Sequence, residues 1–305
     1  MKSKNKEIRM KKHNLKEWIL ATRPWSFPAS TMPVLVTLCY LFWLGYEVNW
    51  AIGIWTLLNI VVFHAAGNTW SDYFDYKKGV DREDTIGGVS ITSGTFNPAE
   101  IRMLAIVLLI AAVISGLTLV LFTGLPTLYL GIAGAVLTLL YPFLKYNALG
   151  DVDIFLTYSI LPILGTSFVA TGIFHYETLW LSLPIGLITV GILHSNNMRD
   201  TEDDKRANIK TFAMLIGKRA SLYIYYTEII LPFIWIIICS IIGIFPLWSL
   251  ITIIALKPAT DIIKKASHFI TEGKKCLQGV DEGTAKLQLI FSLLTVLSFI
   301  IDKFA

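Results

Sequence analysis

The chain has 305 residues, of which 54% are hydrophobic and 16% are charged, with a formal net charge of +4. A soluble domain carries about 25% charged residues, and the mean hydropathy here is +0.62. These values exclude a soluble globular protein and leave no separate soluble domain. We therefore expect the lipid bilayer as the surroundings of the chain, and neither a nucleic acid nor an obligate protein partner.

Apolar stretches of about 20 residues recur along the chain and predict an all-α integral membrane protein. Residues 1–24 are expected to form a basic cytosolic tail without a removable signal peptide, and 25–305 a single transmembrane domain. The eighth predicted helix is the weakest, because its apolar run is short and breaks at Lys257-Pro258. We expect nine transmembrane helices, over roughly 27–46, 51–70, 102–123, 126–144, 152–174, 178–197, 220–243, 246–262 and 284–302.

The distribution of basic residues supports this count and sets the orientation. Cytoplasmic loops of membrane proteins carry an excess of Lys and Arg. With the N-terminus in the cytosol, 25 of the 26 Lys and Arg residues fall in cytosolic segments or at their edges, and only Lys303 does not. A wrong helix count would place the later loops on the opposite side of the membrane and remove this asymmetry. We expect a multi-pass protein of the plasma (inner) membrane.

An acidic stretch ends the second predicted helix, after the apolar run from Trp55 to Ala66. Asn68, Asp72 and Asp75 are spaced i, i+4 and i+7 and so share one face of a helix. Asp81 can fold back toward them from a turn at Gly79. Acids at the end of a membrane segment are usually functional, and carboxylate and amide oxygens are the ligands that Mg²⁺ prefers.

A second acidic stretch follows the sixth predicted helix, on the same predicted side of the membrane. Asp200 and Asp204 are spaced i, i+4, and Asn196 or Asn197 lies one turn earlier. Two acidic faces across a cavity predict a divalent-metal clamp, and Mg²⁺ held in this way usually also binds substrate phosphates. The implied substrate is a diphosphate. The alternative is that these acids only pair with nearby bases at solvated loop ends.

Three basic residues are placed where they can neutralise a diphosphate: Arg23 before the first predicted helix, Lys145 after the fourth, and Arg199 inside the second acidic stretch. Their alternative roles are snorkelling to the membrane surface and setting the topology. For His64 and His194 a hydrogen-bonded core position is favoured over a general base.

Cys39, Cys239 and Cys276 are far apart and fit no metal or disulfide spacing. We interpret them as ordinary buried or interfacial residues. The sequence thus places its chemistry in the two acidic stretches and the bases near them.

The two motifs together resemble the paired signature of the UbiA superfamily of membrane prenyltransferases. Within it, the chain is most similar to the 1,4-dihydroxy-2-naphthoate polyprenyltransferases of menaquinone synthesis. That subfamily usually has Asn directly before the first Asp, where this chain has Ser71. The residues that carry the resemblance are Asp72-Tyr-x-Asp75-x3-Gly79-x-Asp81 and Asn196-Asn197-x-Arg199-Asp200-x3-Asp204, followed by Thr211 and Gly217.

The resemblance implies a nine-helix prenyltransferase bundle that transfers a prenyl group from a polyprenyl diphosphate to an aromatic acceptor. The acceptor implied is 1,4-dihydroxy-2-naphthoate, with loss of CO₂; 4-hydroxybenzoate or another acceptor is the alternative within the superfamily, and a cation transporter the alternative outside it. The expected Mg²⁺ ligands are Asn68, Asp72, Asp75, Asp81, Asn197, Asp200 and Asp204. Catalytic roles are expected for Asp72, Asp200, Arg199 and Lys145, and diphosphate binding for Arg23, Lys145 and Arg199.

Overall fold

The computed structural model describes residues 13–85 and 89–305. Most of the predicted tail (1–12) therefore lies outside the described residues. Within the described part, the chain is helical throughout and contains no β-sheet. The predicted all-α class is confirmed.

Eight helices in the described residues are long and apolar enough to cross a membrane, counting η1 with α2, α7 and η2 with α8, and η3 with α9. The longer elements are α2 (Pro28–Leu44), α3 (Trp50–Lys78), α5 (Pro98–Thr123), α6 (Leu125–Lys145), α8 (Leu161–Thr171), α9 (Ser182–Arg199), α12 (Lys218–Ile241), α13 (Leu256–Ser267) and α15 (Val280–Phe304). The shorter ones are α1 (Leu15–Ala21), η1 (Pro24–Ser26), α4 (Val89–Thr92), α7 (Gly150–Phe155), η2 (Leu156–Ile160), η3 (Tyr176–Leu181), α10 (Thr201–Arg206), α11 (Phe212–Ile216), η4 (Leu247–Ala255), α14 (Phe269–Glu272) and η5 (Gly273–Leu277).

The segment expected as an eighth span, 246–262, does not form one long α-helix. Residues 247–255 form the 3-10 helix η4, which continues directly into the polar helix α13. A 3-10 helix is tighter than an α-helix and rarely runs beyond a few residues. The break lies at Ala255–Leu256, two residues before the Lys257-Pro258 pair that weakened this segment in the sequence.

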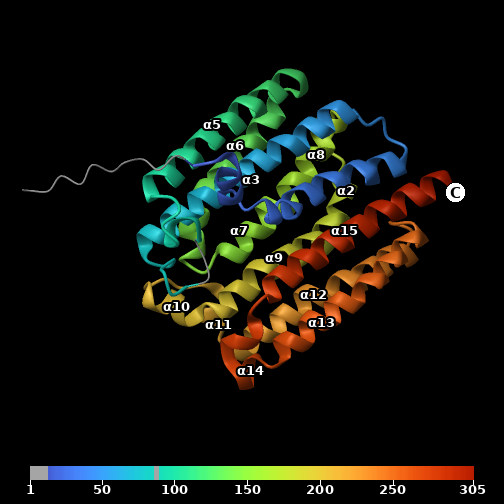
Figure 1. The fold of residues 1–305 in the computed structure, drawn as a ribbon. Coiled ribbons are helices and arrows are strands. Elements are labelled where there is room, and N and C mark those ends of the chain that lie inside the picture. Colours follow the sequence, from blue (N-terminus) through green and yellow to red (C-terminus); the bar gives the residue numbers. More distant parts are fainter. Residues whose placement is uncertain (1–12, 86–88) are drawn as a thin grey trace, which may run out of the picture.

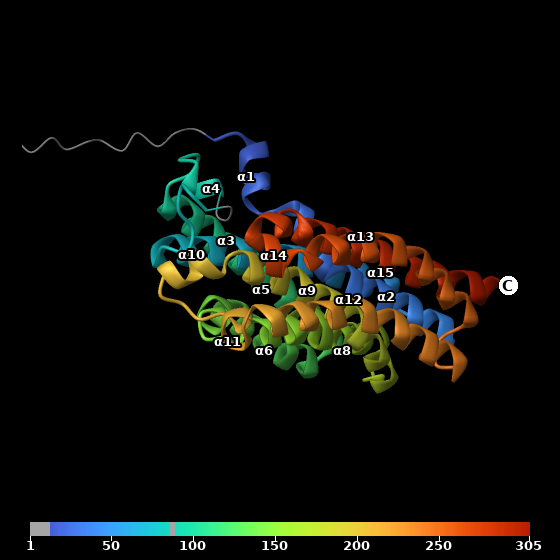
Figure 2. The same cartoon turned by 90° about the horizontal axis from the view of Figure 1, so that it is seen from below.

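The helices lie roughly along one direction (Figures 1 and 2). The elements α10, α11 and α14 lie at the end opposite the C-terminus, as Figure 1 shows. Both views place α10 beside the loop that follows α3. Segments separated by about 120 residues of sequence therefore meet at this end.

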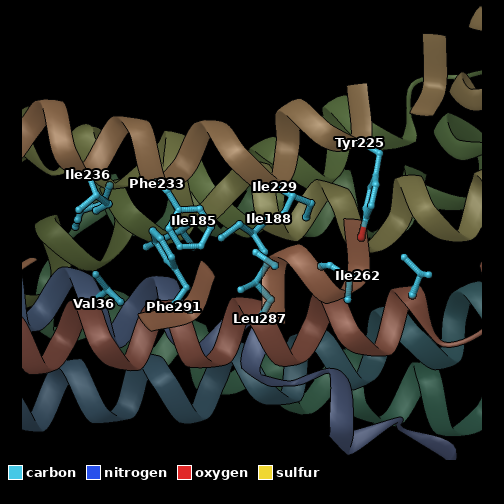
Figure 3. Close-up of a cluster of buried hydrophobic side chains, with 14 of the residues drawn as sticks. Val36, Ile185, Ile188, Tyr225, Ile229, Phe233, Ile236, Ile262, Leu287 and Phe291 are labelled. Atoms are coloured by element: carbon cyan, nitrogen blue, oxygen red, sulfur yellow. The ribbon is translucent and has the colours of Figure 1, made fainter. Parts of the chain in front are cut away.

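A large apolar core joins the C-terminal half of the bundle to α2. Figure 3 shows Ile185 and Ile188 of α9 between side chains of α12 and α15, among them Phe233 and Phe291. These four side chains are at most 3% exposed. In contrast, only 6% of the most apolar window of α6 is buried, which is the pattern of a helix that faces lipid.

Candidate active site

The first acidic cluster forms because α3 continues for about three turns beyond its apolar part, which ends at Ala66. Asp72 and Asp75 lie in its last two turns, and their residues are 1% and 5% exposed. Gly79 ends the helix with φ of +78°, a left-handed conformation that glycine adopts without strain. This turn brings Asp81 back to a buried position beside them. The predicted turn at Gly79 is confirmed.

Each acid of α3 has its own basic partner. The guanidinium of Arg23 donates to Asp72. The carboxylate of Asp75 accepts three hydrogen bonds, from Lys145 Nζ at 3.1 Å, from the Tyr146 hydroxyl at 2.8 Å and from the Ser71 hydroxyl at 3.1 Å. Ser71, which departs from the motif of the resembling subfamily, therefore orients the second acid of the cluster.

Asn68 fixes the segment that carries Arg23. Its amide nitrogen donates to the Thr22 carbonyl at 2.9 Å and to the Ser26 hydroxyl at 3.0 Å. Arg23 itself has a left-handed backbone with φ of 56°, which is uncommon for a residue with a side chain. The amide oxygen of Asn68 takes no part in these two bonds.

The second acidic cluster lies at the junction of α9 and α10. Asp204, on α10, is 2% exposed. Asp200, at the junction, accepts two bonds of 2.8 Å from the guanidinium of Arg199, which also donates to Asp281 at 2.9 Å. Arg199 is thus held within its own half of the site. Asp281 lies at the start of α15, and the spacing of the motif does not predict it as a partner of Arg199.

Ion pairs and a small apolar cluster join the two acidic clusters. Arg82 of the first loop lies 3.7 Å from Asp203 of α10, and Arg206 of α10 lies 2.9 Å from Asp84 of the first loop. Beneath them an apolar cluster is formed by Val80, Ala207 and Ile209, with Tyr146 packed against it. The structure therefore brings together the two stretches that the sequence singled out.

Lys145 Nζ donates to Asp75 of the first cluster at 3.1 Å, and the charges of Asp81 and of Asp204 in the second cluster also act on its ammonium group. It ends α6, and the chain then packs so tightly that a Cβ on Gly150 would lie 3.1 Å from the Lys145 Cα. Burial and the Asp75 charge raise the pKa of the Tyr146 phenol, which keeps it protonated as a donor.

Several carboxylates in the described part of the chain have a buried oxygen without a hydrogen-bond partner. Two of these atoms belong to the acidic clusters, Oδ2 of Asp81 and Oδ2 of Asp204, and another is Oδ1 of Asp281 beside Arg199. Burial raises the pKa of Asp81 and that of Asp204 to about 7, with further contributions from neighbouring acids. Two acids of this kind, one from each cluster, form a site that takes either protons or a cation.

The remaining predicted residues lie in other contacts. Asn197 donates to Asp151 at 3.3 Å, whereas the side-chain oxygen of Asn196 is buried and without a partner. His64 is a core histidine hydrogen-bonded to Ser30 at 2.9 Å, as expected. The three cysteines are buried and free, also as expected.

An apolar cavity of about 260 Å³ lies deeper in the bundle, among α2, α3, α5, α6, η2 and α8. Phe63 of α3 lines it and precedes Asp72 by nine residues, about 13 Å along the helix. Gly131 and Gly134 of α6 also line it, and a Cβ at either position would meet no atom within 4 Å. The charged end of the site and this cavity therefore follow each other along the same helix.

Comparison with known proteins supports the family resemblance. The model of the UbiA prenyltransferase family matches residues 30–274. The UbiA prenyltransferase domain-containing protein 1 homolog of Drosophila melanogaster is 31% identical over 299 residues, which is 93% of this chain and 79% of that protein. The protein of that name from Danio rerio is 28% identical over 290 residues, with 93% and 84% covered. The names of these relatives do not indicate the naphthoate subfamily that the motif details predict.

Solved structures share the fold at low sequence identity. The apo UbiA homolog from Aeropyrum pernix K1 has a TM-score of 0.66 at 14% identity, covering 92% of this chain and 97% of that one. The UbiA homolog from Archaeoglobus fulgidus bound to GPP and Mg²⁺ has a TM-score of 0.58 at 14% identity, covering 92% and 99%. At this identity the likeness concerns the fold alone.

Proposed function

The chain belongs to the UbiA prenyltransferase family of membrane enzymes, and from this we propose that it transfers a polyprenyl group from a polyprenyl diphosphate to an aromatic acceptor. The observation that carries the proposal is the meeting of the two acidic clusters, which the ion pairs Arg82–Asp203 and Arg206–Asp84 join. The apolar cavity follows this site along α3. A diphosphate needs the charged end, and a polyprenyl chain needs the cavity.

The donor set fits Mg²⁺. Hard oxygen ligands suit this ion. Asp81 and Asp204 each have a buried carboxylate oxygen without a hydrogen-bond partner. We assign its binding to Asp72, Asp75 and Asp81 on one side and to Asp200 and Asp204 on the other. When bound, Mg²⁺ would neutralise the charge that develops on the diphosphate as the allylic C–O bond breaks. A homolog of the same fold was solved with GPP and Mg²⁺, which supports the choice of Mg²⁺ as the ion.

Asparagine side chains are proposed to add an amide oxygen to each set of ligands. The oxygen of Asn68 completes the first set of ligands. Asn197 was expected in the second set, but its amide nitrogen is bonded to Asp151. The unpartnered oxygen of Asn196 is the better-placed alternative, because it is the one amide oxygen of the pair that is buried without a partner.

The basic residues hold the leaving diphosphate. Lys145 is oriented by Asp75, and the charge of the second cluster also acts on it, so it can contact a diphosphate placed between the two clusters. Arg23 approaches from the side of Asp72. Arg199 acts through Asp200, which it holds by two bonds. Positive groups fixed in advance around a leaving group lower the barrier because they need not reorganise during the reaction.

The apolar cavity protects the prenyl cation from water. Its lining is almost entirely aliphatic, with the aromatic ring of Phe63 and a few hydroxyl and amide groups. The electron-rich acceptor ring then forms the new C–C bond to the allylic carbon. With 1,4-dihydroxy-2-naphthoate, the ring carbon that carries the carboxylate is attacked and CO₂ leaves. We propose this acceptor because the Gly79-x-Asp81 and Asn196-Asn197 details of the motifs resemble those of the naphthoate subfamily.

The proposal includes the topology. The N-terminus and both acidic clusters face the cytosol, 25–305 form one transmembrane domain in the plasma (inner) membrane, and η4 with α13 complete the ninth passage. The distribution of Lys and Arg supports this orientation. A cation transporter, the other class considered, would place its coupling acids near the midplane, whereas the two clusters here lie at helix ends.

The acceptor is tested with membranes that contain the protein, Mg²⁺ and a polyprenyl diphosphate. 1,4-Dihydroxy-2-naphthoate and 4-hydroxybenzoate are offered in parallel, and the lipid products are identified by mass. A prenylated naphthoquinol without the carboxylate, absent after EDTA, is the expected product. Prenylated hydroxybenzoate would refute the acceptor and keep the reaction class, and absence of diphosphate release with any acceptor would refute the reaction.

A further inference from the structure

A second group of titratable side chains lies inside the bundle, apart from the two acidic clusters. It consists of Asp151 at the start of α7, His194 in α9 and Glu228 in α12. One ligand atom from each lies within 4.8 Å of the others, and all three residues are buried. Three helices thus bring a nitrogen and two carboxylate oxygens to one point inside the bundle.

The spacing of these atoms matches a metal site. Nδ1 of His194 lies 2.9 Å from Oδ2 of Asp151 and 3.3 Å from Oε1 of Glu228. Ligands about 2.0 Å from a tetrahedral Zn²⁺ are about 3.3 Å from one another. The remaining oxygen of Glu228, Oε2, is buried without a partner. Glu228 is 5% exposed, so no bulk water reaches this oxygen, and it can supply a fourth donor.

The surrounding hydrogen bonds orient the ligands. Nε2 of His194 lies 2.7 Å from the hydroxyl of Ser221, and the second oxygen of Asp151 accepts from Asn197 at 3.3 Å. Metal-binding histidines commonly donate their other ring nitrogen to a polar group in this way, which fixes the tautomer. If Nε2–H donates to the Ser221 hydroxyl, the lone pair of Nδ1 faces two carboxylate oxygens. A metal ion bound among the three atoms would then take all three lone pairs.

The charges of the cluster lead to the same conclusion. Among the described residues, no Lys or Arg forms an ion pair with Asp151 or Glu228, and His194 is the one basic partner of both. Even a protonated His194 would leave one of two buried carboxylates uncompensated, which is costly inside a membrane protein. A divalent cation with a neutral histidine balances both.

We propose that Asp151, His194 and Glu228 bind a structural transition-metal ion of the Zn²⁺ class, distinct from the Mg²⁺ at the two acidic clusters. A nitrogen and two or three carboxylate oxygens suit Zn²⁺ better than Mg²⁺, which prefers oxygen ligands and retained water. The ion ties α7 and α12 to α9 one to two turns before Asp200. It therefore fixes the helix end that carries the second acidic cluster.

The test is the metal content of the full-length protein, purified in detergent from cells supplied with Zn²⁺ and passed over a chelating resin. The wild-type protein should retain about one Zn²⁺ per chain. Glu228→Gln keeps the size of the side chain and removes its charge, and it should lower the retained Zn²⁺ at least ~10-fold. Asp72→Asn, in the first acidic cluster, is the matched control and should retain Zn²⁺ like the wild type while losing prenyl transfer.

A second measurement covers the case in which Glu228→Gln does not fold. Wild-type protein loaded with Co²⁺ should show the visible absorption of a tetrahedral site without a thiolate band, and Zn²⁺ should raise the melting temperature of metal-free protein. A wild-type protein that retains no metal and shows neither signal would overturn the proposal, leaving a histidinium shared by two carboxylates. Equal Zn²⁺ in the wild type and in folded Glu228→Gln would overturn it as well.

Discussion

Substitution of Lys145 tests the electrostatic part of the mechanism, because the Asp75 carboxylate accepts from both a charged donor and a neutral donor. Asp75 accepts from Lys145 Nζ at 3.1 Å and from the Tyr146 hydroxyl at 2.8 Å. Lys145→Met removes the charge and keeps most of the volume. Tyr146→Phe removes a neutral donor to the same carboxylate. The two variants therefore separate charge from the positioning of Asp75.

The structure sets the expected magnitudes. Two unit charges 3.1 Å apart interact by about 5 kcal/mol at an effective dielectric constant of about 20. That value is an upper limit, because Lys145 loses hydration when it is buried. Removing one fixed donor to a developing negative charge typically lowers kcat about 100- to 1,000-fold, and we expect this loss for Lys145→Met. Tyr146→Phe removes a hydrogen bond from a neutral donor to the charged Asp75 carboxylate, which contributes about 1.5 kcal/mol at the lower end of the usual range, equivalent to about tenfold.

The assay is prenyl transfer at saturating donor and acceptor, normalised to the amount of protein inserted in the membrane. Asp75 keeps bonds from Ser71 and Tyr146 in Lys145→Met, so insertion should be normal. The reasoning is refuted if Lys145→Met retains a third or more of wild-type kcat. Equal losses in both variants would show instead that Lys145 only positions Asp75.

Two further predictions concern the metal and the cavity. Because the pKa values of Asp81 and Asp204 are raised to about 7, protons compete with Mg²⁺ for them, and below pH 7 the apparent Mg²⁺ affinity should fall roughly tenfold per pH unit for each carboxyl. Mg²⁺ titrations of activity between pH 6 and 8 measure this, and an affinity independent of pH would contradict it. Gly131→Leu fills open space in the cavity without a clash, so it should reduce activity with long donors more than with short ones. Val136→Phe, on the exposed side of the same helix, is the control, and equal losses for all donor lengths in Gly131→Leu would refute the role of the cavity.

The general plan of the site was predictable from the sequence, because it depends on local spacing. The spacing of Asp72 and Asp75 places both on one helix face, and Gly79 marks the turn that returns Asp81. The two stretches were expected on one side of the membrane because Lys and Arg mark that side. None of these inferences needs the packing of one helix against another.

The parts that could not be predicted depend on that packing. Arg199 could equally well have faced the first cluster, and its pairing with Asp281 follows from the position of α15. The buried group around His194 brings together residues from three helices. Glu228 was the available signal, since it is the one acid within the apolar stretch 220–241. A single acid in an apolar stretch indicates a buried partner but does not identify it.

The central claim is that both acidic clusters act together on one diphosphate. The most direct measurement is Mg²⁺-dependent release of diphosphate from a polyprenyl diphosphate, compared among wild type, Asp72→Ala and Asp200→Ala in membranes that contain equal amounts of each protein. We expect that either substitution alone abolishes release while the protein still inserts. Full activity in either variant would contradict it.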